Sequence, residues 1–158
     1  MDVGDIAGRA GPGPGGPGSA VPPLVFQISR VLRTALDRRM AGHGLTFPQA
    51  SLLIRCVRHP GTSPSQLMPH MGTDNAGVTR LADRLEAAGL VVRRAGGRDR
   101  RSITLEPTAA GAALAPELEQ VLAGTVRQLL SGLSEEELDQ LTGLLRRVMA
   151  SAAELDQQ

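Results

Sequence analysis

The sequence predicts a mainly α-helical fold with one two-stranded β-hairpin, on the basis of three observations. Apolar residues recur at helical spacing along most of the 158-residue chain. Three of the amphipathic segments open with the Ser/Thr-x-x-Gln/Glu pattern of a capping box. One short region, 90–106, instead contains two short apolar stretches on either side of a Gly-Gly pair, which is typical of two strands joined by a turn. The length suits one compact domain with appendages.

Composition narrows the kinds of partner that the chain can bind. Hydrophobic residues make up 41% of the chain, enough for a core, but aromatic residues make up only 1%. Proteins that bind single-stranded nucleic acid usually stack bases on aromatic rings, so a duplex is the better fit here. All 17 basic residues are Arg, which forms paired hydrogen bonds to phosphate and guanine, although GC-rich codon usage also explains the absence of Lys.

Charge is distributed unevenly along the chain, although the net charge is only +1. Residues 24–111 contain 13 Arg and 6 acidic residues, a net charge of +7, whereas residues 112–158 contain 3 Arg and 8 acidic residues, a net charge of −5. A basic body with an acidic C-terminal segment predicts one face turned toward a polyanion and another face turned elsewhere.

The chain opens with a segment, 1–23, that contains seven Gly and five Pro. Such a segment cannot bury enough apolar surface to offset its ordering entropy, so we expect a disordered tail, either a tolerated extension or one with a role of its own. An amphipathic helix follows from Leu24 to Ala41, and Gly42 and Gly44 end it. We expect residues 24–45 to form a dimerisation helix.

The next three elements have the order of a helix-turn-helix. A capping box at Thr46–Gln49 opens a helix that His59-Pro60-Gly61 ends, and a second box at Ser63–Gln66 opens a short helix. Gly72-Thr73 forms the turn, and Asp74 caps the longer helix that follows.

The longer helix, Asn75–Ala88, has two distinct faces. One face has the spacing of a buried stripe, made of Val78, Leu81, Ala82 and Leu85. The opposite face and its flank carry the residues that we expect to contact DNA, namely Asn75, Ala76, Gly77, Thr79, Arg80 and Arg84. The like charges of Arg80 and Arg84 are unfavourable at i, i+4 unless both face an anion. Ion pairs with Asp83 or Glu86 would also relieve this repulsion.

A basic β-hairpin follows this helix directly. Leu90–Arg94 and Ser102–Glu106 are the predicted strands, and Gly96-Gly97 supplies the positive φ that the turn needs. Helix, turn, helix and basic hairpin together predict a winged helix-turn-helix. The wing is expected to bind DNA through Arg98, Asp99, Arg100 and Arg101, with a solvated basic loop as the alternative. We assign residues 46–107 to DNA binding.

Two long helical segments complete the chain over residues 108–158. Pro116 is expected to kink the first segment or to mark its first turns, and a third capping box at Ser134–Glu137 opens the second. Their apolar stripes, together with that of the first helix, exceed what a winged helix of this size can cover. The surplus predicts a two-fold homodimer held by these helices.

Several motifs resemble the signature of the MarR family of dimeric winged-helix transcriptional regulators, over roughly Leu24 to Leu155. The motifs are Val78-Thr79-Arg80-Leu81, Asp83-Arg84-Leu85-Glu86, Gly89-Leu90-Val91 and Asp99-Arg100-Arg101. The resemblance implies that Asp99 orients Arg101 toward the minor groove. It also implies that a lipophilic or phenolic effector binds between the dimerisation helices and the winged region and weakens DNA binding. The chain departs from the family pattern at Pro107-Thr108, where Leu-Thr is usual, and Pro69 is expected to bend or shorten the short helix.

The sequence therefore predicts a cytoplasmic, ligand-responsive repressor that binds double-stranded DNA as a homodimer. Its operator would be pseudo-palindromic, with half-sites about 34 Å apart. A non-sequence-specific architectural DNA-binding protein is the alternative.

An enzyme or ligand carrier built on the same helices is not expected, because no catalytic or metal-ligand set is clustered in the sequence. His43, His59 and His70 lack metal-ligand spacing, and Cys56 lies among apolar residues and is interpreted as part of the core. We expect no cofactor other than the effector. No apolar run approaches the ~20 residues of a membrane span, so no membrane partner is expected.

Overall fold

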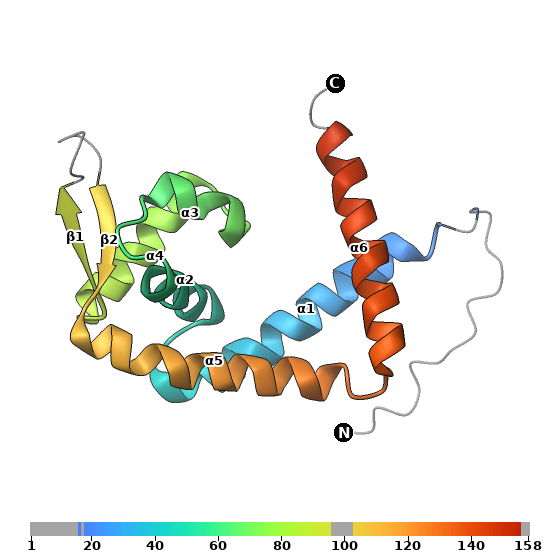
Figure 1. Cartoon of the computed structure of the whole chain (residues 1–158), viewed down its shortest axis with the longest axis horizontal. Helices are drawn as coiled ribbons and strands as arrows, with labels where there is room; N and C mark the ends of the chain where they lie inside the picture. The colour runs from blue at the N-terminus through green and yellow to red at the C-terminus, as the bar shows by residue number, and fades with distance from the viewer. Residues whose placement is uncertain (1–15, 17, 96–102, 156–158) are drawn as a thin grey trace.

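The computed structural model describes residues 16, 18–95 and 103–155, and it confirms the mainly helical winged helix-turn-helix fold (Figure 1). In chain order the helices are α1 (Val21–Met40), the 3-10 turn η1 (Ala41–His43), α2 (Phe47–Arg58), α3 (Pro64–Met71), α4 (Asn75–Ala87), α5 (Ala109–Leu129) and α6 (Glu135–Leu155). The strands β1 (Val91–Ala95) and β2 (Ile103–Pro107) form the antiparallel wing between α4 and α5.

The first helix starts earlier than predicted, at Val21 rather than Leu24. Pro22 and Pro23 lie in its first turn, where backbone N–H groups have no partner within the helix, so proline is tolerated there. Most of the predicted disordered tail, residues 1–15 and 17, lies outside the described residues.

All three predicted capping boxes form. The backbone N–H of the first residue donates to the side-chain oxygen of the last at 2.7 Å in Thr46–Gln49, 2.9 Å in Ser63–Gln66 and 2.8 Å in Ser134–Glu137. These bonds satisfy donors that the first helical turn leaves unpaired, and they fix where α2, α3 and α6 begin.

Two helices continue through an internal proline. The helix α3 continues through Pro69 to Met71, and α5 includes Pro116 within its 21 residues. Each proline removes one backbone hydrogen bond, and the neighbouring bonds retain the helix. Pro107 is the last residue of β2, and α5 starts after Thr108, which caps it through a bond from the Gly111 N–H to the Thr108 hydroxyl at 3.1 Å.

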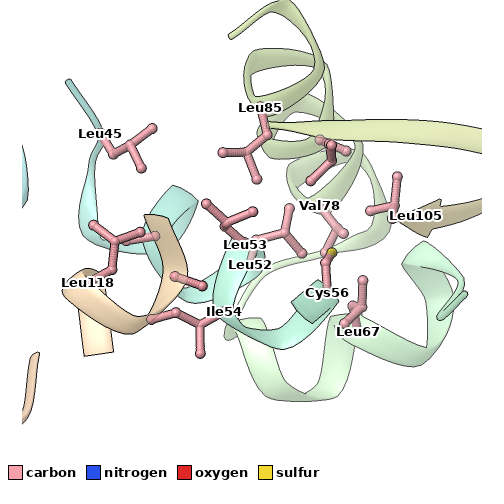
Figure 2. Close-up of a cluster of buried hydrophobic side chains, with 14 of the residues drawn as sticks. Leu45, Leu52, Leu53, Ile54, Cys56, Leu67, Val78, Leu85, Leu105 and Leu118 are labelled. Carbon is pink, nitrogen blue, oxygen red and sulfur yellow. The ribbon is translucent and has the colours of Figure 1, made fainter. Parts of the chain in front are cut away.

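The hydrophobic core is centred on α2. Leu52, Leu53 and Cys56 are fully buried between α4, α5 and the wing. Figure 2 shows the Cys56 sulfur beside Val78 of α4 and Leu67 of α3. Full burial of one such leucine contributes about 1.5–3 kcal/mol, so this core orients α4 firmly against α2 and the wing.

The wing is attached to the body at its base. Its register pairs Val91 with Pro107 and Ala95 with Ile103, so each strand runs one residue later than predicted. The backbone N–H of Leu105 also donates to the Thr62 carbonyl at 3.0 Å, which ties β2 to the α2–α3 connection. The base of the wing is therefore held by backbone bonds on both edges of β2.

A compact joint connects α4 with α5. Gly89 ends α4 with φ +70°, and the Thr108 hydroxyl donates to its carbonyl at 2.7 Å. Gly111 packs so closely on Leu90 that an added Cβ would lie 2.1 Å from the Leu90 carbonyl oxygen. Glycine is therefore required at this position for α5 to approach the end of α4.

The outer helices α1 and α6 extend away from this body (Figure 1). Their exposed apolar side chains include Leu24, Val25, Phe26, Ile28 and Val31 of α1 and Leu141, Leu144, Leu145, Val148 and Met149 of α6. We call this set the α1/α6 apolar surface. None of the helices in the described part of the chain combines the length and apolar character that a membrane span requires.

Candidate nucleic-acid interface

The helix α4 presents one buried and one exposed face, as the sequence predicted. Asp74 caps it by accepting a hydrogen bond from the Gly77 N–H at 2.7 Å. Val78, Ala82 and Leu85 are fully buried against the core. The solvent-exposed side carries most of the predicted site residues, namely Asn75, Ala76, Thr79, Arg80 and Arg84.

Gly77 is placed differently from the exposed position expected for it. It is buried, and an added Cβ would lie 2.0 Å from the Thr73 hydroxyl oxygen. The capping bond from Asp74 draws the Gly77 backbone into the turn, and Thr73 covers it. Gly77 therefore allows the α3–α4 turn to close tightly, a role that the sequence pattern did not indicate.

Thr79 is exposed, but its hydroxyl is engaged within the helix. The Thr79 Oγ1 donates to the Asn75 carbonyl at 2.8 Å. This bond fixes the side-chain rotamer and leaves the methyl group and one oxygen lone pair for an outside contact.

Arg93 of β1 binds the acidic residues of α4. Its guanidinium contacts Asp83 at 2.6 Å and Glu86 at 2.5 Å, and its Nη2 also donates to the Thr79 carbonyl at 3.4 Å. The hydrogen bond to Asp83 is the largest cause that raises the pKa of Arg93 above its ordinary value. Arg93 thus fastens the wing to α4 and neutralises two carboxylates on that side.

The acidic residues of α4 pair with Arg93 and not with the neighbouring arginines of the same helix. Ion pairs of Arg80 or Arg84 with Asp83 or Glu86 were the alternative to DNA contact. Within the described residues, both carboxylates pair with Arg93, and no acidic group lies within ion-pair distance of Arg80 or Arg84.

The two arginines of β1 do not both face outward. Arg94 is exposed and lies 3.5 Å from Glu106 on β2, whereas Arg93 turns toward α4. The predicted wing residues Arg98, Asp99, Arg100 and Arg101 lie outside the described residues.

Cys56 and the histidines do not form a reactive site in the described structure. Burial raises the pKa of the Cys56 thiol to about 11, which keeps it protonated and unreactive at neutral pH. Among the residues that the structure covers, no group of His, Cys, Asp and Glu could hold a metal ion.

A largely apolar hollow of about 630 Å³ lies between α2, α5 and the α5–α6 connection. Ile54, Leu122 and Val126 contribute apolar lining, and Arg58 and Glu119 form an ion pair at 2.9 Å within it. Its size falls in the range of small-molecule sites in proteins. The family resemblance implied an effector site in this part of the fold, but no residue pattern marked this hollow, because its walls come from residues 54–58 and 119–138, which are far apart in the sequence.

Comparison with known proteins agrees with this architecture. The MarR family model matches residues 43–102, which span η1 to the wing. The transcriptional regulator PA3341 is 30% identical, with 84% of this chain and 98% of that one covered and a TM-score of 0.76.

Two further solved structures share the fold. One is a putative MarR family transcriptional regulator from Listeria monocytogenes in complex with 26mer DNA, at 22% identity, 85% and 89% coverage and a TM-score of 0.78. The other is CouR from Rhodococcus jostii RHA1 bound to p-coumaroyl-CoA, at 22% identity, 79% and 88% coverage and a TM-score of 0.72.

The fold and the cationic face of α4 define a winged helix-turn-helix protein of the DNA-binding class. The chain belongs to the MarR family of transcriptional regulators. Membership of a regulator family also confirms the non-enzymatic class predicted from the sequence.

Proposed function

We propose that the protein is a sequence-specific regulator that inserts α4 into the major groove of double-stranded DNA. The observation that carries this proposal is the exposed face of α4, where Arg80 and Arg84 lack acidic partners within the described residues. Asn75, Ala76 and Thr79 lie on the same side, near the N-terminal end of the helix, where recognition helices contact base edges.

The wing would contact the adjacent minor groove. Resemblance to the family supports this role for Arg98, Asp99, Arg100 and Arg101, with Asp99 orienting Arg101. Arg93 and the Leu105–Thr62 backbone bond support it as well, because they hold the base of the wing in a fixed position relative to α4. The DNA complex of the Listeria relative shows that this fold can be crystallised on a duplex.

We propose that the protein acts as a homodimer through the α1/α6 apolar surface. A groove of about 740 Å³ between α1 and α6 is lined by apolar side chains of both helices, Leu24 and Leu144 among them. Such an area is costly to leave in water, and a second copy would cover it. Two-fold symmetry would place two α4 helices on half-sites about one DNA turn, ~34 Å, apart.

The regulator is proposed to be a ligand-responsive repressor in the cytoplasm. The hollow between α2 and α5 is a candidate effector site, and CouR, which shares the fold, binds p-coumaroyl-CoA. A lipophilic or phenolic ligand in this hollow would change how α2 packs on α5 and so alter the spacing of the two α4 helices. Domain assignment follows the same division, with residues 46–107 binding DNA and residues 24–45 and 108–158 forming the dimer.

A competition titration separates this function from non-specific architectural binding. The probe is duplex DNA from upstream of the protein's own gene, challenged with an unrelated duplex of equal length. A specific regulator should prefer its own site by about 10³-fold or more at physiological salt. Equal affinity for both duplexes would instead favour an architectural role, which binds through charge alone.

A further inference from the structure

A cleft at the exposed face of α4 brings arginines of two helices together. Arg33 of α1 lines the same cleft as Arg80 and Arg84 of α4, with a volume of about 330 Å³. The remaining lining comes from the start of α2 and from the α3–α4 turn, and none of the described lining residues is acidic. We call this feature the three-arginine cleft.

The charges around this cleft are unbalanced. Within the described residues, no carboxylate lies within ion-pair distance of Arg33, Arg80 or Arg84. Three like charges that converge on one hollow repel one another, and an anion between them would reverse the sign of that interaction. Arg93, nine residues after Arg84, is by contrast paired with Asp83 and Glu86.

The position of the cleft indicates which anion fits. Arg80 and Arg84 belong to the helix that we place in the major groove, so the cleft opens at the edge of that contact. A base would have to leave its stack to reach a hollow at this edge, whereas the backbone phosphates run along it. Arginine also matches phosphate oxygens geometrically through its fork of N–H donors.

Arg33 lies on the side of α1 opposite Leu24, Ile28 and Val31 of the α1/α6 apolar surface, although Phe26 of that surface is on the same side as Arg33. At 100° per residue, it is about 140° around the helix from Ile28. A dimer that covers Ile28 would therefore leave Arg33 directed toward α4 rather than toward the partner.

We propose that the three-arginine cleft binds a phosphate of the DNA backbone, and that Arg33 is a DNA contact on a helix otherwise devoted to dimerisation. This inference rests on the proposed DNA-binding function. It extends the interface beyond α4 and the wing, and it links the dimer helix directly to the position of one phosphate.

The test measures DNA affinity of Arg33→Gln, Arg33→Lys and Arg38→Gln by fluorescence anisotropy over a series of salt concentrations. Arg38 is the matched control, since it lies on the same helix, about 140° from Arg33, and lines a different hollow. Because it shares that hollow with Val31 of the α1/α6 apolar surface, dimer dissociation is measured for Arg38→Gln as well. Arg33→Gln should lose roughly threefold to tenfold in affinity for specific and unrelated duplexes alike. The slope of log affinity against log salt should be smaller by about 1.8, because the symmetric dimer loses two phosphate contacts at about 0.9 each. Arg33→Lys should retain most of the affinity, and Arg38→Gln should match the wild type.

The outcomes also separate this inference from the proposed function. If Arg80→Gln weakens binding but Arg33→Gln matches the wild type, the phosphate contact of Arg33 is wrong and the function of α4 stands. A shift in dimer dissociation without a change in salt slope would show that the cleft receives acidic residues of a second copy, which also overturns the proposal. A wild-type protein that binds no duplex would overturn both.

Discussion

The helices α4 and α6 have opposite exposed faces, although both are amphipathic. In α4 the apolar stripe is covered, with Val78 and Leu85 at 0% exposure, and the cationic face is open. In α6 the apolar residues themselves are open, with Val148 at 57% and Met149 at 69% exposure. The difference indicates two partners of different chemistry: a polyanion for α4 and an apolar surface for α6.

The largest expected effect tests whether the apolar face of α4 or that of α6 is buried within a single chain. Leu85→Ala should destabilise the fold by about 2–5 kcal/mol, because it leaves a cavity in a packed core. Leu144→Ala is the same change in α6. Because Leu144 would be covered only in the dimer, its effect on the free energy of unfolding should depend on protein concentration. Urea unfolding at several protein concentrations measures both, and a concentration-independent loss in Leu144→Ala would mean that α6 is covered within its own chain.

The next effect concerns the partner of α6. Leu144→Glu combined with Val148→Glu would place charges in the proposed dimer contact and should raise the dimer dissociation constant roughly hundredfold or more, about 2.7 kcal/mol. Sedimentation equilibrium measures this shift. Arg146→Glu, at an exposed position about 160° around the helix from both Leu144 and Val148, lowers the net charge by the same two units and serves as the control. An unchanged dimer would place the interface elsewhere.

A smaller effect on DNA affinity should follow from breaking the ion pairs between Arg93 and the acidic residues of α4. Arg93→Gln leaves Asp83 and Glu86 unpaired beside the DNA-facing side, so affinity for all duplexes should fall about tenfold through repulsion of phosphate. Adding Asp83→Asn to Arg93→Gln should recover part of the loss, since one of the released charges is then absent. The dimer should be unaffected by either change. No recovery in the double variant would mean that the loss comes from release of the wing or from a direct contact of Arg93 with DNA, and not from the charges of the acidic residues.

The smallest effect is expected at Thr79. Thr79→Ala removes a methyl group and a hydroxyl from the exposed face, and it should relax base preference at one or two positions by about 1 kcal/mol. Binding-site selection from randomised duplexes measures the preference. Equal loss at every position would assign Thr79 to the DNA backbone instead of the bases.

Local features of this fold were predictable because neighbouring residues determine them. The three capping boxes and the two faces of α4 follow from residues three or four positions apart, and each was found as predicted. Gly77 departed from the pattern because helical spacing places it at the flank, whereas the cap at Asp74 and the cover of Thr73 enclose it.

Features that depend on tertiary placement were beyond the sequence. The bond from Arg93 to Asp83 requires the way β1 folds back on α4, and no periodicity encodes it. Arg33 and Arg80 are 47 residues apart along the chain, and they line one cleft because α1 passes near the α3–α4 turn. The strands run one residue later than predicted, and Pro107 is accommodated as the last residue of β2, where it pairs with Val91.

The joint at Gly89, Thr108 and Gly111 has a mechanical consequence. The Thr108 hydroxyl donates to the Gly89 carbonyl, and Gly111 packs directly on Leu90. These contacts restrict movement of α5 relative to the end of α4. We therefore expect α4 and α5 to move as one rigid unit, so that a tilt of α5 reorients α4 by the same angle. We expect spin labels on α4 and α5 of one protomer to keep a constant separation with and without DNA, while labels on the two α4 helices change theirs.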